Sequence, residues 1–545
     1  MCATGFASAT RIGVTCFVAL AEPAAHEYDA MTMDQVRSEN ECFNVAFCSA
    51  KVRSFAERKA TLTSRLVLGA LPRELPVSAR EIENFGRNVR FTPATFYEPK
   101  SEAEVLEILD RHKGEAIRVM GRLHSWSDAV RTEGVLLDLK NLNRVEIEPS
   151  ENARQAKVGA GCQIKHLLKE LRVQGGYTLP SVGLITEQTI AGAIATGTHG
   201  SGKHSISHYV EAVRLASYDP ETGKAVISEI SFGDKLLAAR CSLGNLGVIV
   251  SVKMEIRRQY NVEEHFRRYK NLADVLKQEK DYPLQQFYFL PWKWNFFAQH
   301  RRETDRPKSR LASVYRVYWF LLMDLGLHLL LLFAVRLLKS ARFARFLYRR
   351  VIPCLVIRNW RVVDDSSSML VMEHELFRHL EIELFVKAGQ LEPALEFVQQ
   401  VLTVAGEGRS IPEPLLEKLP DETSRNKLQD LSGCYSHHYP ICVRRVLPDD
   451  TLISMAQGGD EPCYAISLIT YEHPNRREGF FRVAEFLAES MAALFAARPH
   501  WGKYCPLEPE QLIPLYERFR EYKKICNEFD PAGVFRNEWM EKLLT

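Results

Sequence analysis

The chain has 545 residues, which is too long for one hydrophobic core and predicts two or three domains. Its formal net charge is +3, from 71 basic and 68 acidic side chains, and this near balance excludes a dedicated nucleic-acid-binding protein. The 12 cysteines include no C-x-x-C pair and the 16 histidines show no ligand spacing, so we expect neither a metal site nor a disulfide framework.

The first 60 residues carry mixed signals. Arg11 precedes a short apolar run at 12–21, which has the shape of a weak targeting signal, whereas residues 27–44 are polar without a clear period. We predict a poorly defined N-terminal extension at 1–60, with a targeting signal as the alternative.

A strand, a helix and a second strand are predicted next. Residues 89–97 alternate like a strand, residues 98–112 have one apolar helical face, and the apolar run at 117–120 ends in a turn at Gly121. This order is typical of an α+β nucleotide-binding lobe. It is not a Rossmann unit, because no G-x-G-x-x-G follows the first strand.

Residues 189–202, TIAGAIATGTHGSG, have almost no side-chain bulk. A chain this bare lets backbone N–H groups approach a flat or anionic ligand closely. The hydroxyls of Thr189, Thr196, Thr198 and Ser201 add hydrogen-bonding groups for a carbonyl-rich ring or a pyrophosphate. The alternative is a small-residue turn beside a buried strand.

Further motifs follow in a fixed order, namely 117–127 (IRVMGRLHSWS), 158–162 (VGAGC), 178–184 (TLPSVGL), 241–250 (CSLGNLGVIV), 500–503 (HWGK) and 530–535 (DPAGVF). With the glycine-rich stretch, this series resembles the flavin domain of vanillyl-alcohol-oxidase-type and sugar-lactone-oxidase flavoproteins. The last two motifs resemble the closing motifs of the aldonolactone and alditol oxidase branch, which includes D-arabinono-1,4-lactone and L-gulonolactone oxidases.

The resemblance implies an α+β fold, in which a two-lobed PCMH-type FAD-binding domain is followed by a cap domain with an antiparallel sheet flanked by helices. We place the FAD-binding domain with its lead-in at 61–258 and the cap domain at 259–500. An apolar and basic insertion is expected at 314–350, and a C-terminal segment at 501–545 is expected to return to the flavin site.

The resemblance also implies that FAD is the cofactor. In the resembled branch a Gly-x-Gly-His-Ser turn carries a histidine bonded covalently to the flavin, and here Gly121, His124 and Ser125 match, while Leu123 replaces the second glycine. We therefore predict FAD with a possible covalent link through His124; the alternative is a buried histidine bonded to a carbonyl. The predicted cofactor contacts are Gly121, His124, Ser125, Pro180, Gly183, Thr186, Thr189, Gly192, Thr196, Thr198, His199, Gly200, Ser201, Gly202, Gly247 and Ile249.

Two cationic side chains match positions that stabilise charge on the substrate or the flavin in the resembled branch. Arg444 lies in CVRRV and Lys503 in HWGK, and we predict both as catalytic; for Arg444 the alternative is a surface salt bridge. Cys442 stands where the resembled strand carries glutamate, which puts the usual polyol substrate in doubt. Glu381 or Glu383 could supply a carboxylate from a neighbouring strand, or could face solvent.

The implied reaction is hydride transfer to flavin N5 from the CH–OH group of a sugar lactone, a polyol or a related alcohol, with oxygen or a quinone-like acceptor. One alternative is a membrane-associated dehydrogenase or reductase that acts on a larger hydrophobic or lipid-linked substrate with a non-oxygen acceptor. Another is a non-catalytic flavin-fold scaffold.

Residues 317–335 are apolar except for Asp324 and His328, and as a helix they would extend roughly 28 Å. Asp324 and the need to return to Lys503 argue against crossing a bilayer. Basic residues then recur at helical spacing, at Arg336, Lys339, Arg342, Arg345 and Arg349. We predict that 317–350 lies on an anionic membrane surface, on the cytoplasmic side rather than in a secreted protein. The alternative is a helical pair packed on the cap.

Overall fold

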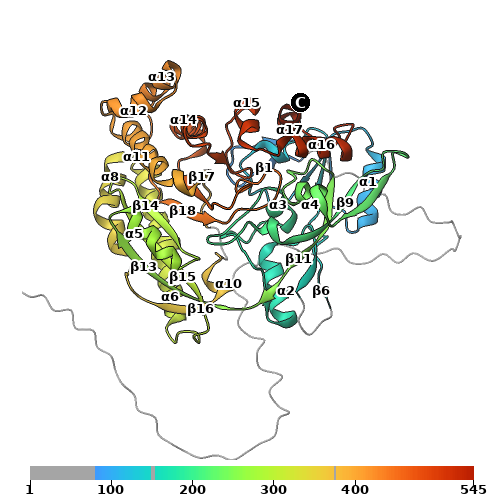
Figure 1. The fold of residues 1–545 in the computed structure, drawn as a ribbon, viewed down its shortest axis with the longest axis horizontal. Coiled ribbons are helices and arrows are strands. Elements are labelled where there is room, and N and C mark those ends of the chain that lie inside the picture. The colour runs from blue at the N-terminus through green and yellow to red at the C-terminus, as the bar shows by residue number, and fades with distance from the viewer. Residues whose placement is uncertain (1–79, 149–153, 373–375) are drawn as a thin grey trace, which may run out of the picture. The chain divides into compact units, whose positions relative to one another are not determined.

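The computed structural model describes residues 80–148, 154–372 and 376–545 (Figure 1). A small parallel sheet lies near the start of the described chain. Its strand order is β3-β5-β4, and the central strand is buried because Val135–Asp138 is almost wholly apolar. The strands are β3 (Thr95–Tyr97), β4 (Ile117–Met120) and β5 (Val135–Asp138), and α1 (Glu102–Arg111) connects the first two. A short hairpin, β1 (Ile82–Glu83) and β2 (Arg90–Phe91), precedes them.

A five-stranded antiparallel sheet completes this lobe, which we call the flavin lobe, residues 80–258. Its order is β10-β9-β11-β7-β6. The strands are β6 (Val145–Ile147), β7 (Gln155–Gly159), β9 (Val210–Tyr218), β10 (Ala225–Ile230) and β11 (Val248–Glu255), with the pair β8 (Tyr177–Thr178) and β12 (Arg257–Arg258) beside them. The helices are α2 (Ile164–Gly175), α3 (Ile190–Ala195) and α4 (Gly233–Arg240).

An eight-stranded sheet, paired antiparallel throughout, dominates the rest of the described chain. Its order is β16-β13-β15-β14-β18-β19-β17-β20. The strands are β13 (Asn261–Tyr269), β14 (Gln286–Leu290), β15 (Asn295–Thr304), β16 (Val362–Asp365), β17 (Leu380–Lys387), β18 (Ile441–Val446), β19 (Cys463–Thr470) and β20 (Arg498–Pro499). The amphipathic helices α11 (Leu391–Glu407) and α14 (Glu478–Phe495) pack together and against β17, where their apolar faces are buried. Smaller helices are α5 (Leu272–Leu276), α10 (Ser366–Met369), α12 (Glu413–Lys418) and α13 (Glu422–Asp430).

A long helical segment packs on the same sheet through one side. It consists of α6 (Ala312–Trp319), a π-helical turn at Phe320–Leu327, α7 (His328–Leu332) and a second π-helical stretch at Phe333–Leu337. Met323, Leu327 and Leu331 are buried in one cluster with Leu290 and Phe297 of the sheet. After a left-handed residue at Lys339 (φ +50°), α8 (Ala341–Phe346), a π-helical turn at Leu347–Val351 and α9 (Ile352–Leu355) follow.

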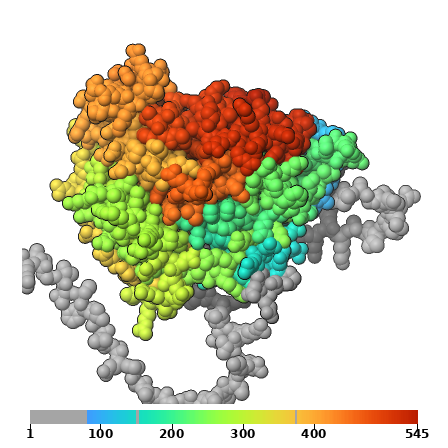
Figure 2. Space-filling model, viewed as in Figure 1, coloured from blue at the N-terminus to red at the C-terminus, as the bar shows by residue number. Residues whose placement is uncertain are grey.

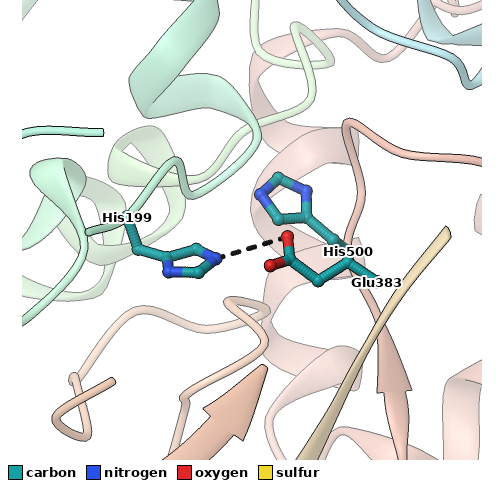
Figure 3. Close-up of side chains that lie close together, drawn as sticks. All are labelled: His199, Glu383 and His500. Carbon is teal, nitrogen blue, oxygen red and sulfur yellow. Dashed lines mark hydrogen bonds and ion pairs between the residues drawn. The ribbon is translucent and has the colours of Figure 1, made fainter. Parts of the chain in front are cut away.

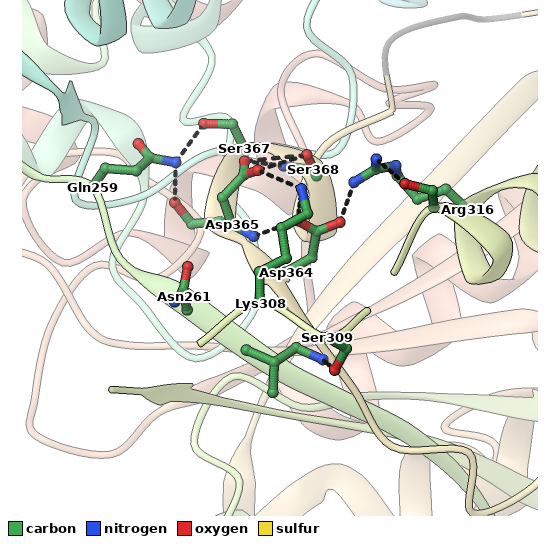
Figure 4. Close-up of polar contacts among 12 residues, drawn as sticks. Gln259, Asn261, Lys308, Ser309, Arg316, Asp364, Asp365, Ser367 and Ser368 are labelled. Atoms are coloured by element: carbon green, nitrogen blue, oxygen red, sulfur yellow. Dashed lines mark hydrogen bonds and ion pairs between the residues drawn. The ribbon is translucent and has the colours of Figure 1, made fainter. Parts of the chain in front are cut away.

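Ion pairs fix the start of this segment to the edge strand β16 (Figure 4). Asp364 of β16 is fully buried, and it accepts from Arg316 of α6 and from Lys308 Nζ at 2.5 Å. Its neighbour Asp365 caps α10 through a bond from the Ser368 backbone N–H (3.0 Å). These ion pairs therefore fix the start of helix α6 to strand β16.

The C-terminal residues return to the flavin lobe. Figure 2 shows them, in red, adjoining both the orange and the green parts of the chain on one face. The backbone N–H of Ile117 donates to Val534 O (2.8 Å), and the buried guanidinium of Arg118 donates to Phe535 O. The helices here are α15 (Pro509–Leu512), α16 (Phe519–Phe529) and α17 (Glu538–Leu544). The last residues thus complete the edge of β4.

These elements confirm the predicted α+β class with an antiparallel sheet flanked by helices. The domain limits stay a prediction, and residues 1–60, with the expected targeting signal or extension, lie outside the described residues. The strand expected at 89–97 is broken in two around Pro93. After β18 the chain folds into turns, because Asp449 accepts bonds from Thr451 and Ser454.

Candidate active site

A cavity of about 770 Å³ lies between the flavin lobe, the eight-stranded sheet and the helical segment. Most of the predicted cofactor residues form its wall, namely Gly121, His124, Ser125, Gly183, Thr189, Gly192, Thr196, Thr198, His199, Gly247 and Ile249. The others, Pro180, Thr186, Gly200, Ser201 and Gly202, lie outside that wall. The Ser201 hydroxyl donates to Gln285 O and the Gly202 N–H to Arg445 O (2.7 Å), so these two residues join the flavin lobe to the sheet.

The backbone of this wall leaves no room for side chains at two of its glycines. A Cβ on Gly121 would lie 2.6 Å from the Thr189 hydroxyl oxygen. Gly247 adopts φ +138°, and a Cβ on it would lie only 2.5 Å from Ala216 O. Leu123, which replaces the expected glycine, also has a left-handed backbone (φ +58°). Leu123 therefore adopts a backbone conformation that glycine favours.

The polar groups of the wall fit a bound cofactor. The Thr198 hydroxyl and the Gln188 side-chain oxygen are buried in the cavity wall and have no hydrogen-bond partner within the described ranges. Buried polar atoms are nearly always partnered, so these two are suited to a ligand that carries both donors and acceptors. His124 also faces the cavity and stacks on Phe85, with ring centroids 4.8 Å apart.

Arg444 and Lys503 both line this cavity, although one lies in a strand and the other in a loop. Arg444 points from β18, and its Nη1 lies 3.6 Å from Glu383 Oε1 of β17. Lys503, in the loop after β20, places Nζ 2.5 Å from Glu381 Oε2 and 4.4 Å from the centre of the Trp126 ring. The surface-salt-bridge alternative for Arg444 is wrong, because both partners line the interior cavity and Glu383 is 1% exposed.

Two carboxylates stand on β17, which is separated from Cys442 of β18 by the strand β19. Strand pairing places Cys442 opposite Ser467, and Ser467 opposite Glu383, so these three residues form one row across the sheet. Glu381, on the same face, accepts a hydrogen bond from the Ser467 hydroxyl. The solvent-facing alternative for Glu381 and Glu383 is wrong, since both side chains are buried.

Two histidines flank Glu383 (Figure 3). His199 points at the carboxylate, with Nε2 3.4 Å from Glu383 Oε2, and the His500 ring lies beside it, 5.7 Å from the His199 ring. Burial opposes ionisation of Glu383, but the charges of His199 and Arg444 outweigh it and lower its pKa. Burial lowers the pKa of His500 well below its usual value, so its ring is neutral.

The same three residues are close enough to suggest a metal site, because their ligand atoms lie within 4.8 Å of one another. The hydrogen bonds favour an ion-pair network instead. The Gly502 N–H donates to His500 Nδ1 (2.9 Å), which leaves the ring proton on Nε2, and Glu383 already pairs with Arg444 and contacts His199 Nε2. Sequence reasoning missed this cluster, although His500 stands in the HWGK motif.

Away from Arg444 and Lys503, the cavity is lined by one set of apolar residues and one set of polar residues. Helical residues Trp319, Phe320, Met323 and Leu327 face Phe266, Leu290 and Phe297 of the sheet. A polar group formed by Glu264, Gln286, Gln299, Arg301 and Tyr315 lies on the same cavity wall. Neither set was identified from the sequence, because its members come from separate strands and one helix.

Comparisons with known proteins show which families this chain is similar to. The family D-arabinono-1,4-lactone oxidase matches residues 250–543, and a family described as FAD binding domain matches residues 93–224. A "long-chain alcohol oxidase" from an uncultured marine euryarchaeote is 56% identical over 463 residues, covering 85% of this chain and 96% of the relative. Mouse (Mus musculus) "L-gulonolactone oxidase" is 26% identical, covering 85% and 98%. Among solved structures, "solvent-stable cholesterol oxidase" shares the fold, with a TM-score of 0.66, 15% identity and coverage of 87% and 100%.

Proposed function

The chain belongs to the FAD-dependent oxidase family of the D-arabinono-1,4-lactone and L-gulonolactone oxidases, and we propose that it oxidises an alcohol with a long apolar chain. Members of this family act on CH–OH groups, so the chain is an FAD-dependent oxidoreductase and the scaffold alternative is excluded. The observation that carries the substrate proposal is the apolar side of the cavity.

An apolar chain would fill the space that a sugar lactone or a polyol would leave unused. Trp319, Met323 and Leu327 present carbon to the cavity from the helical segment, and Phe266 and Phe297 do so from the sheet. Burying such a chain is favourable by about 0.8 kcal/mol per methylene, whereas polyol hydroxyls facing these rings would lose hydrogen bonds. The relative with 56% identity, named as a long-chain alcohol oxidase, supports the same substrate class.

FAD, when bound, supplies the hydride acceptor. The chain's own residues would orient the alcohol oxygen: Arg444 and Lys503 would present positive charge to it and stabilise the negative charge that develops there during hydride transfer. Glu381 holds Lys503 Nζ, and Glu383 with His199 holds Arg444, so both cations are oriented before substrate binds. Trp126 under Lys503 keeps water from one side of the ammonium group.

Anaerobic bleaching of the purified yellow protein tests the substrate proposal. We expect 1-dodecanol to reduce the flavin quickly and to yield hydrogen peroxide on readmission of oxygen, the acceptor we propose. L-Gulono-1,4-lactone and xylitol are expected to reduce it slowly. Faster reduction by the lactone or the polyol would contradict the proposal, and reduction without peroxide would favour the dehydrogenase alternative.

We also propose that the helical segment lies on an anionic membrane surface. Ala312–Leu337 is long enough to cross a bilayer and contains an 18-residue window with a mean hydropathy of 2.0, yet one side is packed on the sheet. Its other side exposes large apolar side chains, which are Val317, Leu321, Leu329, Phe333 and Leu337. Such a one-sided apolar helix suits the headgroup boundary.

The predicted basic stripe needs correction. Arg336 donates to Tyr471 O (2.7 Å), Arg345 to Gly406 O (2.6 Å) and Arg349 to Glu407 (3.0 Å), so these three residues are bonded within the protein. The left-handed turn at Lys339 also ends the helix, which separates Arg336 from the later residues. The other two of the predicted five, Lys339 and Arg342, are exposed and make no such bond to the described part of the chain.

Sedimentation with phosphatidylserine vesicles tests membrane binding. We expect salt-sensitive binding that falls when Val317, Leu321 and Leu329 are changed to serine, and also when Lys339 and Arg342 are changed to glutamine. Phe232→Ser, on the flavin lobe and 83% exposed, is the matched control and should bind normally. A wild-type protein that stays in the supernatant at low salt would overturn this proposal.

A further inference from the structure

A second polar cluster lies in the cavity, away from Arg444 and Lys503. Glu264 of β13 is 2% exposed, and its carboxylate accepts from Gln299 Nε2 (2.9 Å), from Arg301 Nε (2.6 Å) and from the Tyr315 hydroxyl of α6. Gln286 continues the chain of bonds by donating to Gln299 (2.7 Å). The cluster therefore fixes a set of side chains around one buried arginine.

Arg301 uses only part of its hydrogen-bonding capacity. The residue is 8% exposed and lines the cavity, and its Nε bonds to Glu264. Its two terminal amino groups have no hydrogen-bond partner among the residues that the structure describes. Arg301 bonds to Glu264 through Nε alone, so the two terminal amino groups of its guanidinium can donate to a ligand.

A planar fork of this kind matches a carboxylate, which accepts two parallel N–H bonds from it. The apolar residues Phe297 and Trp319 line the same cavity as Arg301. A ligand that binds the terminal amino groups of Arg301 should therefore combine an apolar body with a charged or oxygen-bearing end. A fatty acid chain has this character, because it joins a carboxylate to a long hydrocarbon.

The register of the sheet gives the separation of Arg301 and Arg444 along the cavity wall. Gln299 pairs with Gln286, which pairs with Arg444, and Arg301 stands two residues beyond Gln299 on the same face. Two strand spacings and two residues place the Cα atoms of Arg301 and Arg444 roughly 12 Å apart. A single ligand with a polar group at each end can therefore contact both arginines.

We propose that Arg301 binds the carboxylate of an ω-hydroxy fatty acid whose hydroxyl end lies at Arg444 and Lys503. This inference rests on the proposed oxidation of long-chain alcohols and specifies its substrate more closely. It makes Arg301 a specificity-determining residue, because the hydroxyl at the reacting end is the same with or without the distal carboxylate.

The test compares ω-hydroxydodecanoate with 1-dodecanol as substrates of the flavin-loaded enzyme. We expect kcat/KM for the hydroxy acid to fall roughly 10- to 100-fold in Arg301→Gln and in Arg301→Lys, with the value for 1-dodecanol unchanged. Arg301→Lys keeps the charge beside Glu264 but loses the fork, so it guards against a folding defect. Arg302→Gln, which alters the opposite face of β15 and a pair with Glu263, is the matched control.

Calorimetry with dodecanoate, which has no hydroxyl to oxidise, separates this inference from the proposed function. Binding to wild type that is lost in Arg301→Gln supports the carboxylate site whether or not alcohols are oxidised. Absence of dodecanoate binding to wild type would overturn the site, even if 1-dodecanol is a good substrate. Equal losses for both substrates in both variants would also overturn it, by assigning Arg301 to the anchoring of helix α6 alone.

Discussion

The two walls of the cavity are built in different ways. The flavin-lobe wall consists of loops in which small residues bring backbone close to a ligand, as at Gly121 and Gly247. The sheet wall consists of charged and aromatic side chains on alternate positions of several strands, as at Glu383 and Arg444. The residues of the loop wall stand in short contiguous motifs, whereas the sheet wall joins residues that are distant in the sequence, such as Gln286 and Arg444, which pair across β14 and β18.

The loop wall makes the prediction with the largest expected effect. If His124 carries the flavin covalently, yellow colour stays with acid-precipitated wild-type protein and is wholly released from His124→Ala. Absorbance of pellet and supernatant measures this. His166→Ala, on the exposed face of α2, is the control and should behave as wild type. Flavin that washes free of the wild type would rule out the link.

The sheet wall makes the next prediction. Removing the charge of Arg444 or Lys503 should slow flavin reduction by the alcohol by roughly 10²–10³-fold, because each cation stabilises developing negative charge. Stopped-flow absorbance under anaerobic conditions measures the rate at saturating substrate. Arg445→Ala alters the neighbouring residue, whose Nε lies 3.8 Å from Glu279 instead, and should leave the rate unchanged. Normal reduction in both variants would remove these residues from the proposed chemistry.

Acid stability should depend on two histidines outside both walls, His328 of α7 and His438 just before β18. Burial lowers the pKa of His328 and of His438 to about 4, while the unfolded value is 6.5. Below pH 6.5 the unfolded chain therefore binds protons on these histidines that the folded protein does not bind. The stability that the neutral histidines contribute is complete above pH 6.5 and is lost as pH falls towards 4. Each histidine should cost about 2 kcal/mol between pH 7 and pH 5. Urea unfolding at both pH values measures the loss.

Replacing one of these histidines sharpens the point. In His328→Gln the amide can still bond to Met323 O and the Tyr439 hydroxyl, so the pH-dependent loss should shrink while stability at pH 7 changes little. His166→Gln on the flavin lobe should leave the pH dependence as in the wild type. An unchanged slope in His328→Gln would show that its burial does not govern the acid response.

The smallest expected effect returns to the loop wall. Leu123 has φ +58°, a conformation that costs an L-residue about 1 kcal/mol and glycine nearly nothing. Leu123→Gly should therefore be more stable than Leu123→Ala by about 1 kcal/mol, the reverse of the usual order in regular structure. Chemical denaturation of the two variants compares them directly. A more stable alanine variant would mean that the turn relaxes on substitution.

The contrast between the walls explains what the sequence could predict. The α+β class, FAD, Arg444 and Lys503 follow from motifs that are contiguous or resemble a known family. The cluster of His199, Glu383 and His500 could not be foreseen, since it depends on strand register and on a loop that closes after β20. The basic stripe was wrong because helical periodicity assumes an unbroken helix, and Lys339 ends it.

The bond from Ile117 to Val534, and that from Arg118 to Phe535, have a consequence for biosynthesis. Strand β4 leads directly into the turn of His124, so the first flavin-binding turn rests on a segment that is synthesised long after it; Arg118 and Phe535 are 417 positions apart. Lys503 is also synthesised long after this turn. We therefore expect that the growing chain cannot capture FAD until Val534 and Phe535 have been added. Clipping the chain ahead of Val534 should accordingly release an apoprotein.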